Sequence, residues 1–119
     1  MVGFRSGMPT NFIGALAERL SDPSPRVRWQ AVSSLARFHK NSSMVVPLII
    51  RVLGDSEASV RRAAIQALTT FGPQARLALP ELGALAERDL ENRRFALDCI
   101  GGIDLNEADR LADKFRMRK

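Results

Sequence analysis

The chain repeats itself with a period of 33 residues, and this periodicity limits its fold more than any other feature. A shift of the sequence by 33 residues aligns residues 20–38 with residues 53–71, and seven of the 19 aligned positions are identical. A further shift of 32 gives a third, weaker copy around residues 93–103. Repeats of this length are supersecondary units that bury a core only by stacking on one another. The identical pairs are Leu20/Leu53, Asp22/Asp55, Val27/Val60, Arg28/Arg61, Ala31/Ala64, Leu35/Leu68 and Phe38/Phe71.

Each copy is expected to hold two helices, so the fold class is all-α. The first helices are predicted over about residues 10–20, 44–53 and 77–88, where Pro47 and Pro80 should each start or kink a helix. The second helices place core residues at i, i+4, i+7, i+8 and i+11, which is one helical face. These residues are Val27, Ala31, Ser34, Leu35 and Phe38, then Val60, Ala64, Ala67, Leu68 and Phe71.

A last amphipathic helix is predicted over residues 105–117 and should cap the array. Its apolar side carries Leu105, Ala108, Leu111, Ala112 and Phe115. The chain is therefore expected to form a single domain, 1–119. It would comprise an N-terminal arm (1–9), repeats at about 10–40, 43–72 and 75–103, and the capping helix.

Capping residues and glycines mark the predicted helix ends. Small polar side chains before a helix can accept its free N–H groups, and glycine adopts backbone conformations that end a helix. The expected caps are Ser24, Ser56, Asp89 and Asp104, and the expected stops are Gly72-Pro73 and Gly101-Gly102.

The pattern Asp-x-x-x-x-Val-Arg-x-x-Ala-x-x-x-Leu occurs twice and resembles HEAT repeats, in particular the short subtype of the phycobilisome lyases. The resemblance covers residues 12–103 and implies a right-handed α-solenoid of about three helix pairs. It also implies a structural ladder of hydrogen bonds between repeats, made by Asp22, Arg28, Asp55 and Arg61. The third copy departs from the pattern, since Asn92 replaces the valine and Glu87 lies near the aspartate position.

The positive charge is divided between the C-terminal tail and the second helices. The sequence pI is about 10.6, but residues 1–109 hold 13 basic and 12 acidic residues, whereas residues 110–119 hold five and one. The second-helix segments 24–40, 57–72 and 90–102 together hold eight basic and three acidic residues. The concave face expected from these helices is therefore relatively positive.

No catalytic, cofactor or metal motif accompanies the repeats, so the chain is not expected to be an enzyme. Cys99 shares a column with Ser34 and Ala67, which predicts a packed thiol, and His39 is expected to cap a helix end or be solvated. A single cysteine cannot form an internal disulfide. The absence of a long apolar run and of a signal-like N-terminus predicts a cytoplasmic protein that does not cross a membrane.

Six side chains opposite the core face form the expected partner-binding ridge, whose partner would be an acidic or amphipathic protein segment. Alternatively, Phe4 or Met8 of the arm covers the tryptophan of this ridge. The ridge comprises Trp29, Arg62 and Arg94 in one row and Ser33, Gln66 and Asp98 one turn later.

Two other functions remain open from the sequence. The tail cations Lys114, Arg116, Arg118 and Lys119 would contact nucleic acid or an acidic surface, unless they only complement the helix dipole. The chain would otherwise be a structural subunit of a larger assembly, and its oligomeric state does not follow from the sequence.

Overall fold

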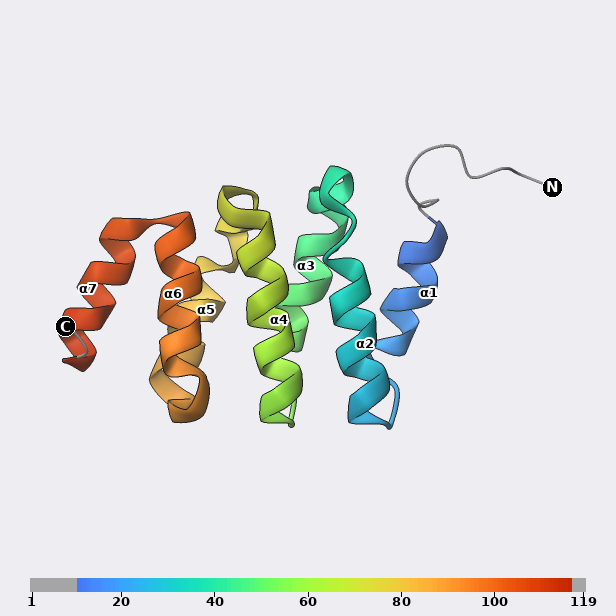
Figure 1. Ribbon diagram of the computed structural model, residues 1–119, viewed down its shortest axis with the longest axis horizontal. Coiled ribbons are helices and arrows are strands. Elements are labelled where there is room, and N and C mark those ends of the chain that lie inside the picture. The colour runs from blue at the N-terminus through green and yellow to red at the C-terminus, as the bar shows by residue number, and fades with distance from the viewer. Residues whose placement is uncertain (1–10, 117–119) are drawn as a thin grey trace.

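The computed structural model describes residues 11–116, which form α-helices joined by short turns and 3-10 helices (Figure 1). Three 3-10 helices, η1 (His39–Asn41), η2 (Gly72–Ala78) and η3 (Leu90–Asn92), precede the third, fifth and sixth α-helices. The α-helices are α1 (Asn11–Arg19), α2 (Pro25–Leu35), α3 (Ser42–Val52), α4 (Ala58–Phe71), α5 (Leu79–Arg88), α6 (Arg93–Ile103) and α7 (Leu105–Phe115).

The helices stack as pairs in two layers. Figure 1 shows α2, α4 and α6 side by side in one row, which we call the second-helix face, with α3 and α5 in the layer behind it and α1 beside α2 at the N-terminal end. Each second helix contacts the next, and α7 packs against α6 at the end opposite α1. The predicted all-α solenoid is confirmed for the described part of the chain.

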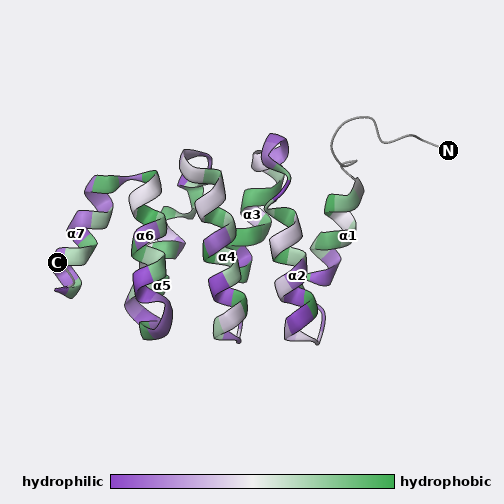
Figure 2. Cartoon of the chain, viewed as in Figure 1, coloured by the Kyte–Doolittle hydropathy of each residue, from purple (hydrophilic) through white to green (hydrophobic). Residues whose placement is uncertain are grey.

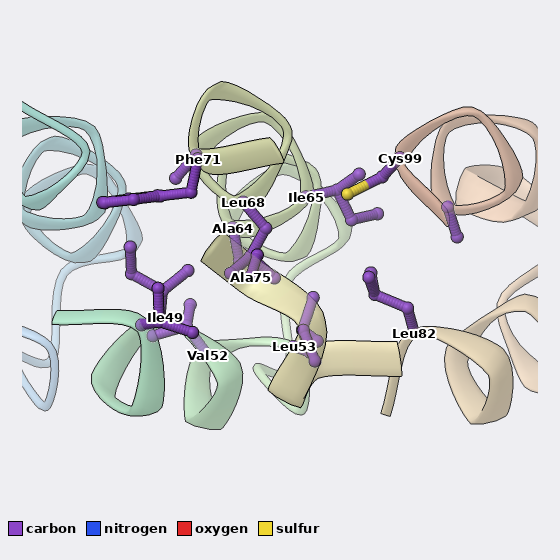
Figure 3. Packing of buried hydrophobic residues seen from close by; sticks show 14 of the residues in the cluster. Ile49, Val52, Leu53, Ala64, Ile65, Leu68, Phe71, Ala75, Leu82 and Cys99 are labelled. Atoms are coloured by element: carbon purple, nitrogen blue, oxygen red, sulfur yellow. The ribbon is translucent and has the colours of Figure 1, made fainter. Parts of the chain in front are cut away.

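The hydrophobic core fills the space between the two layers. Figure 3 shows Ile49 and Leu53 from the α3 side pointing towards Leu68 and Phe71 of α4. All four side chains are buried. Burying one such side chain is worth about 1.5–3 kcal/mol, so the repeated apolar columns hold each pair to its neighbours. Figure 2 shows hydrophilic and hydrophobic residues alternating along α2, α4 and α6.

Three of the four predicted caps lie where expected. Ser24 Oγ accepts a hydrogen bond from the backbone N–H of Val27, and Asp89 and Asp104 cap η3 and α7 in the same way. The prediction for Ser56 is wrong, because α4 begins one residue later with Glu57 as its N-cap. The carboxylate of Asp55 instead accepts the N–H of Glu57, at 2.9 Å, and so organises this turn.

One predicted helix stop is correct and the other is wrong. Gly72 ends α4 with φ at +58°, a conformation that favours glycine. In contrast, α6 continues through Gly101 and Gly102 to Ile103. Gly101 faces α7, where an added Cβ would lie at an ordinary contact distance of 3.6 Å from the Cβ of Ala108. Pro80 lies in the first turn of α5, whereas Pro47 lies inside α3.

The last helix covers the end of the core with only part of its predicted apolar side. Ala108 and Leu111 are buried, and Phe115 is partly buried against the core. Leu105 is 66% exposed, contrary to the expectation. It is the first residue of α7, and a helical side chain leans towards the preceding turn, which the first residue lacks.

Candidate functional site

Paired arginine and aspartate side chains link successive repeats. Arg28 of α2 donates from Nε and Nη2 to both carboxylate oxygens of Asp55, at 2.8 and 3.1 Å. Its Nη1 donates to the backbone carbonyl of Asp22, at 2.8 Å. Arg28 is therefore held in place by the turn of its own repeat and by the carboxylate of the next repeat.

The second link uses a residue that the repeat pattern does not select. Arg61 Nε donates to Asp89 Oδ2 at 2.6 Å, and Arg61 Nη1 donates to the carbonyl of Asp55 at 2.8 Å. Glu87, which lies near the expected aspartate position, forms an ion pair with Lys114 instead. The link between the second and third repeats therefore depends on Asp89.

The ladder carboxylates are held ionised. Burial works against ionisation of Asp55, but the hydrogen bonds from Arg28 and from the N–H of Glu57 outweigh it and leave its pKa below the ordinary value. Burial likewise opposes ionisation of Asp89, and its hydrogen bonds from Arg61 and Asn92 outweigh it, so the pKa of Asp89 is also lowered. Both aspartates accordingly serve the architecture and are not available to a partner.

The third repeat has no aspartate to receive its arginine. Arg93 donates to the carbonyl oxygens of Ala86 and Glu87 at 2.6 and 3.1 Å. Its guanidinium lies over the ring of Phe115, 4.2 Å from the ring centroid. The terminal helix thus contacts Arg93 on the side where a further repeat would otherwise lie.

Trp29 is a large aromatic side chain of the second-helix face, and 44% of it is exposed. It lines an open depression of about 510 Å³ between α2 and α4. The depression has an apolar wall from Trp29 and Pro25 and a polar edge from Arg26. Its lining residues are Ser24, Pro25, Arg26, Trp29, Gln30 and Ser59.

The sequence predicted Arg62 as an exposed residue of the ridge, but two residues of the third repeat hold its side chain. Its Nε donates to Asn92 Oδ1 at 2.9 Å, and its guanidinium lies over the ring of Phe95, 4.4 Å from the centroid. Asn92 is fully buried and also donates to the carbonyl of Ala58 and to Asp89. The side chain of Arg62 is therefore directed towards α6.

The other four predicted ridge residues are exposed on the second helices. Sequence reasoning missed Phe95, which is 40% exposed and makes the aromatic contact with Arg62. The only sequence feature that could have indicated Phe95 is that it directly follows Arg94, on the side of α6 that meets α4. The exposed ridge residues are Ser33 on α2, Gln66 on α4, and Arg94 and Asp98 on α6.

The remaining sequence candidates lie apart from Trp29. Cys99 is buried, and burial raises the pKa of its thiol despite an opposing hydrogen bond from Thr69. The ring of exposed His39 lies 5.2 Å from that of Phe71. Lys114 and Arg116 are exposed at the end of α7, with Lys114 paired to Glu87. The other candidates, Phe4, Met8, Arg118 and Lys119, lie outside the described residues.

The described residues hold neither a metal-binding cluster nor a helix suited to span a membrane. Within residues 11–116, no group of three or more His, Cys, Asp or Glu side chains could hold a metal ion. None of the helices in this range combines the length and apolar character needed to cross a membrane.

Stacked helix pairs with a ladder of side chains between them define an α-helical repeat protein. The family model for HEAT repeats matches residues 13–100, so the chain belongs to the HEAT-repeat family. HEAT repeats are generally protein-interaction or scaffold modules. A search of curated proteins found no match to the chain.

Proposed function

We propose that this protein is a non-enzymatic binding module that holds an acidic or amphipathic segment of a protein partner on its second-helix face. The observation that carries the proposal is the exposed Trp29 beside an open depression. Tryptophan and arginine are enriched among residues that dominate binding energy, and an apolar side chain of the partner would displace water from this depression.

The charge of the surrounding surface favours an acidic partner. Arg26 lies at the edge of the depression, Arg37 is exposed in the turn after α2, and Arg94 is exposed on α6. The acidic residues of the second-helix segments are fewer: Asp98 on α6, Glu91 on η3 and Glu57, the N-cap of α4. Opposite charge on a partner would speed association and set its orientation on the surface.

Nucleic acid is the weaker alternative because the described cations of α7 have acidic partners. Lys114 pairs with Glu87, and Arg110 with Glu107 at 2.6 Å. Phosphate binding would have to compete with these carboxylates. A role as a structural subunit is the third alternative, and light scattering after size exclusion would support it if the chain formed a defined oligomer.

Affinity capture from the native cell with matched variants tests the proposal. The double variant Trp29→Ala, Arg62→Glu should lose the partner and keep its helical circular dichroism. Met44→Ala is the control, because Met44 is also a large exposed apolar residue, 50% exposed, but lies on α3 in the other layer. Capture that is equal for the wild type and the double variant would contradict the proposal.

A further inference from the structure

We infer that Arg62 is a pre-positioned receptor for a carboxylate of the partner, and that this carboxylate lies within about one helical turn of the apolar side chain bound beside Trp29. The inference rests on the proposed function and adds the chemistry of the partner segment. It follows from the contacts of Arg62, its position on α4 and the residues around it.

The guanidinium of Arg62 is fixed on one edge and open on the other. Nε is bound to Asn92, and Phe95 covers one face. Nη1 and Nη2 make no hydrogen bond to another residue in the range 11–116. An arginine presents its donors as a planar fork that fits both oxygens of a carboxylate. Because Arg62 is already held, binding would cost little side-chain entropy.

Arg94 occupies the equivalent position in the third repeat but is not held in this way. It is exposed on α6, and the structure gives it no hydrogen bond or aromatic contact within residues 11–116. A ligand would have to order this long side chain on binding, which costs free energy. Arg94 therefore provides a matched comparison for the effect of anchoring.

The position of Arg62 along α4 sets its distance from the depression. Ser59 forms the α4 side of the depression beside Trp29, and Arg62 follows it by three residues. Residues three apart on a helix lie on the same side, displaced by roughly 4.5 Å along the axis. A helical partner would span both points with an apolar side chain and a carboxylate three or four residues apart.

A protein carboxylate fits this surface better than a chain of phosphates. Asp98 is exposed on α6 and Glu91 on η3, which precedes it, and both would repel a polyanion. Bases bind single-strand proteins by stacking on open aromatic faces, but Arg62 covers a face of Phe95. A single carboxylate carries far less charge than a polyanion and needs no open aromatic face.

A random 12-residue peptide library displayed against the full chain tests this inference. We expect enriched peptides to carry Asp or Glu three or four positions from a large apolar residue. For a synthetic peptide of the most enriched sequence, Arg62→Gln should weaken binding about tenfold, the loss of one charge-assisted contact. Arg62→Lys should also weaken it severalfold, because lysine keeps the charge but lacks the fork. Arg94→Gln should weaken it less than Arg62→Gln does, because this unanchored side chain must be ordered on binding.

The outcomes separate this inference from the proposed function. Two results would overturn the inference and leave the proposed function standing. In the first, the selected peptides need Trp29 but show no preference for acidic residues. In the second, they bind Arg62→Gln or Arg62→Lys with the same affinity as the wild type. Failure to select any Trp29-dependent peptide removes both. If Arg62→Gln does not fold by circular dichroism, Phe95→Leu replaces it, since this variant keeps the charge but loses the stacking contact and should bind severalfold more weakly.

Discussion

Arg61 on α4 donates from Nε to Asp89 Oδ2 at 2.6 Å, and both side chains are largely buried. The contact joins the second repeat to the third, as the contact of Arg28 with Asp55 joins the first to the second. These two links hold the second helices in register. They therefore position Trp29 on α2 and Arg62 on α4 relative to each other.

Removing Arg61 should destabilise the protein much more than removing an exposed arginine. Arg61→Ala leaves the carboxylate of Asp89 without its main partner, and the expected loss is about 2 kcal/mol in the free energy of unfolding. Arg76 is the control, because it is 63% exposed and lies 3.7 Å from Asp104. Arg76→Ala should cost less than about 1 kcal/mol. Urea titrations followed by circular dichroism measure both, and equal losses would contradict the role of the ladder.

Stability should decrease with acid because both ladder aspartates have lowered pKa values. Between the lowered pKa in the folded protein and the ordinary value of 3.8, the unfolded chain binds more protons than the folded one. The stabilisation is therefore complete above about pH 4 and is lost as the pH falls through the folded pKa. Asp55→Asn should lower stability at neutral pH and flatten this dependence.

Urea midpoints measured from neutral pH to about pH 2 would check the acid dependence. Asp98→Asn is the matched control, since it removes an exposed carboxylate of the same type from α6. Its stability curve should run parallel to that of the wild type. A parallel curve for Asp55→Asn would show that the ladder is not the source of the dependence.

The repeat period predicted the helices because the core columns are periodic, and it missed the aspartate of the second link because the segment between the paired helices is not periodic. Asp55 and Arg61 are six residues apart, whereas Asp89 and Arg93 are four apart. The 3-10 helix η3 accommodates this shortening, and Asp89 both caps η3 and receives Arg61. The helices follow from residue spacing alone, but the use of Asp89 as the partner of Arg61 depends on the local path of the chain.

The site was predicted only in part for a related reason. Helical periodicity correctly placed Trp29 and Arg94 on the solvent side, because each position relates only to its own helix. It could not find the contacts of Arg62 with Asn92 and Phe95. Those contacts arise between neighbouring helices, and their partners lie 30 or more residues away in sequence.

Two glycine-to-alanine variants should have opposite effects. Gly72 ends α4 with φ +58° and ψ −134°, a conformation that strains a residue with a Cβ, so Gly72→Ala should cost about 1–2 kcal/mol. Gly14 lies within α1, and an added Cβ would meet open space. Gly14→Ala should stabilise the protein by about 0.5–1 kcal/mol through helix propensity. Thermal unfolding of both variants checks the prediction, which fails if Gly72→Ala is as stable as the wild type.

Trp29 reports its own exposure, because the protein has one tryptophan and no tyrosine. With 44% of the side chain exposed, acrylamide should quench the emission of the native protein, and the emission maximum should move little on unfolding. Deleting residues 1–9 distinguishes this arrangement from the one in which Phe4 or Met8 covers the indole. Unchanged quenching after the deletion is expected, whereas a marked increase would show that the arm shields Trp29. A bound peptide should reduce the quenching in either case, since its apolar side chain would occupy the depression.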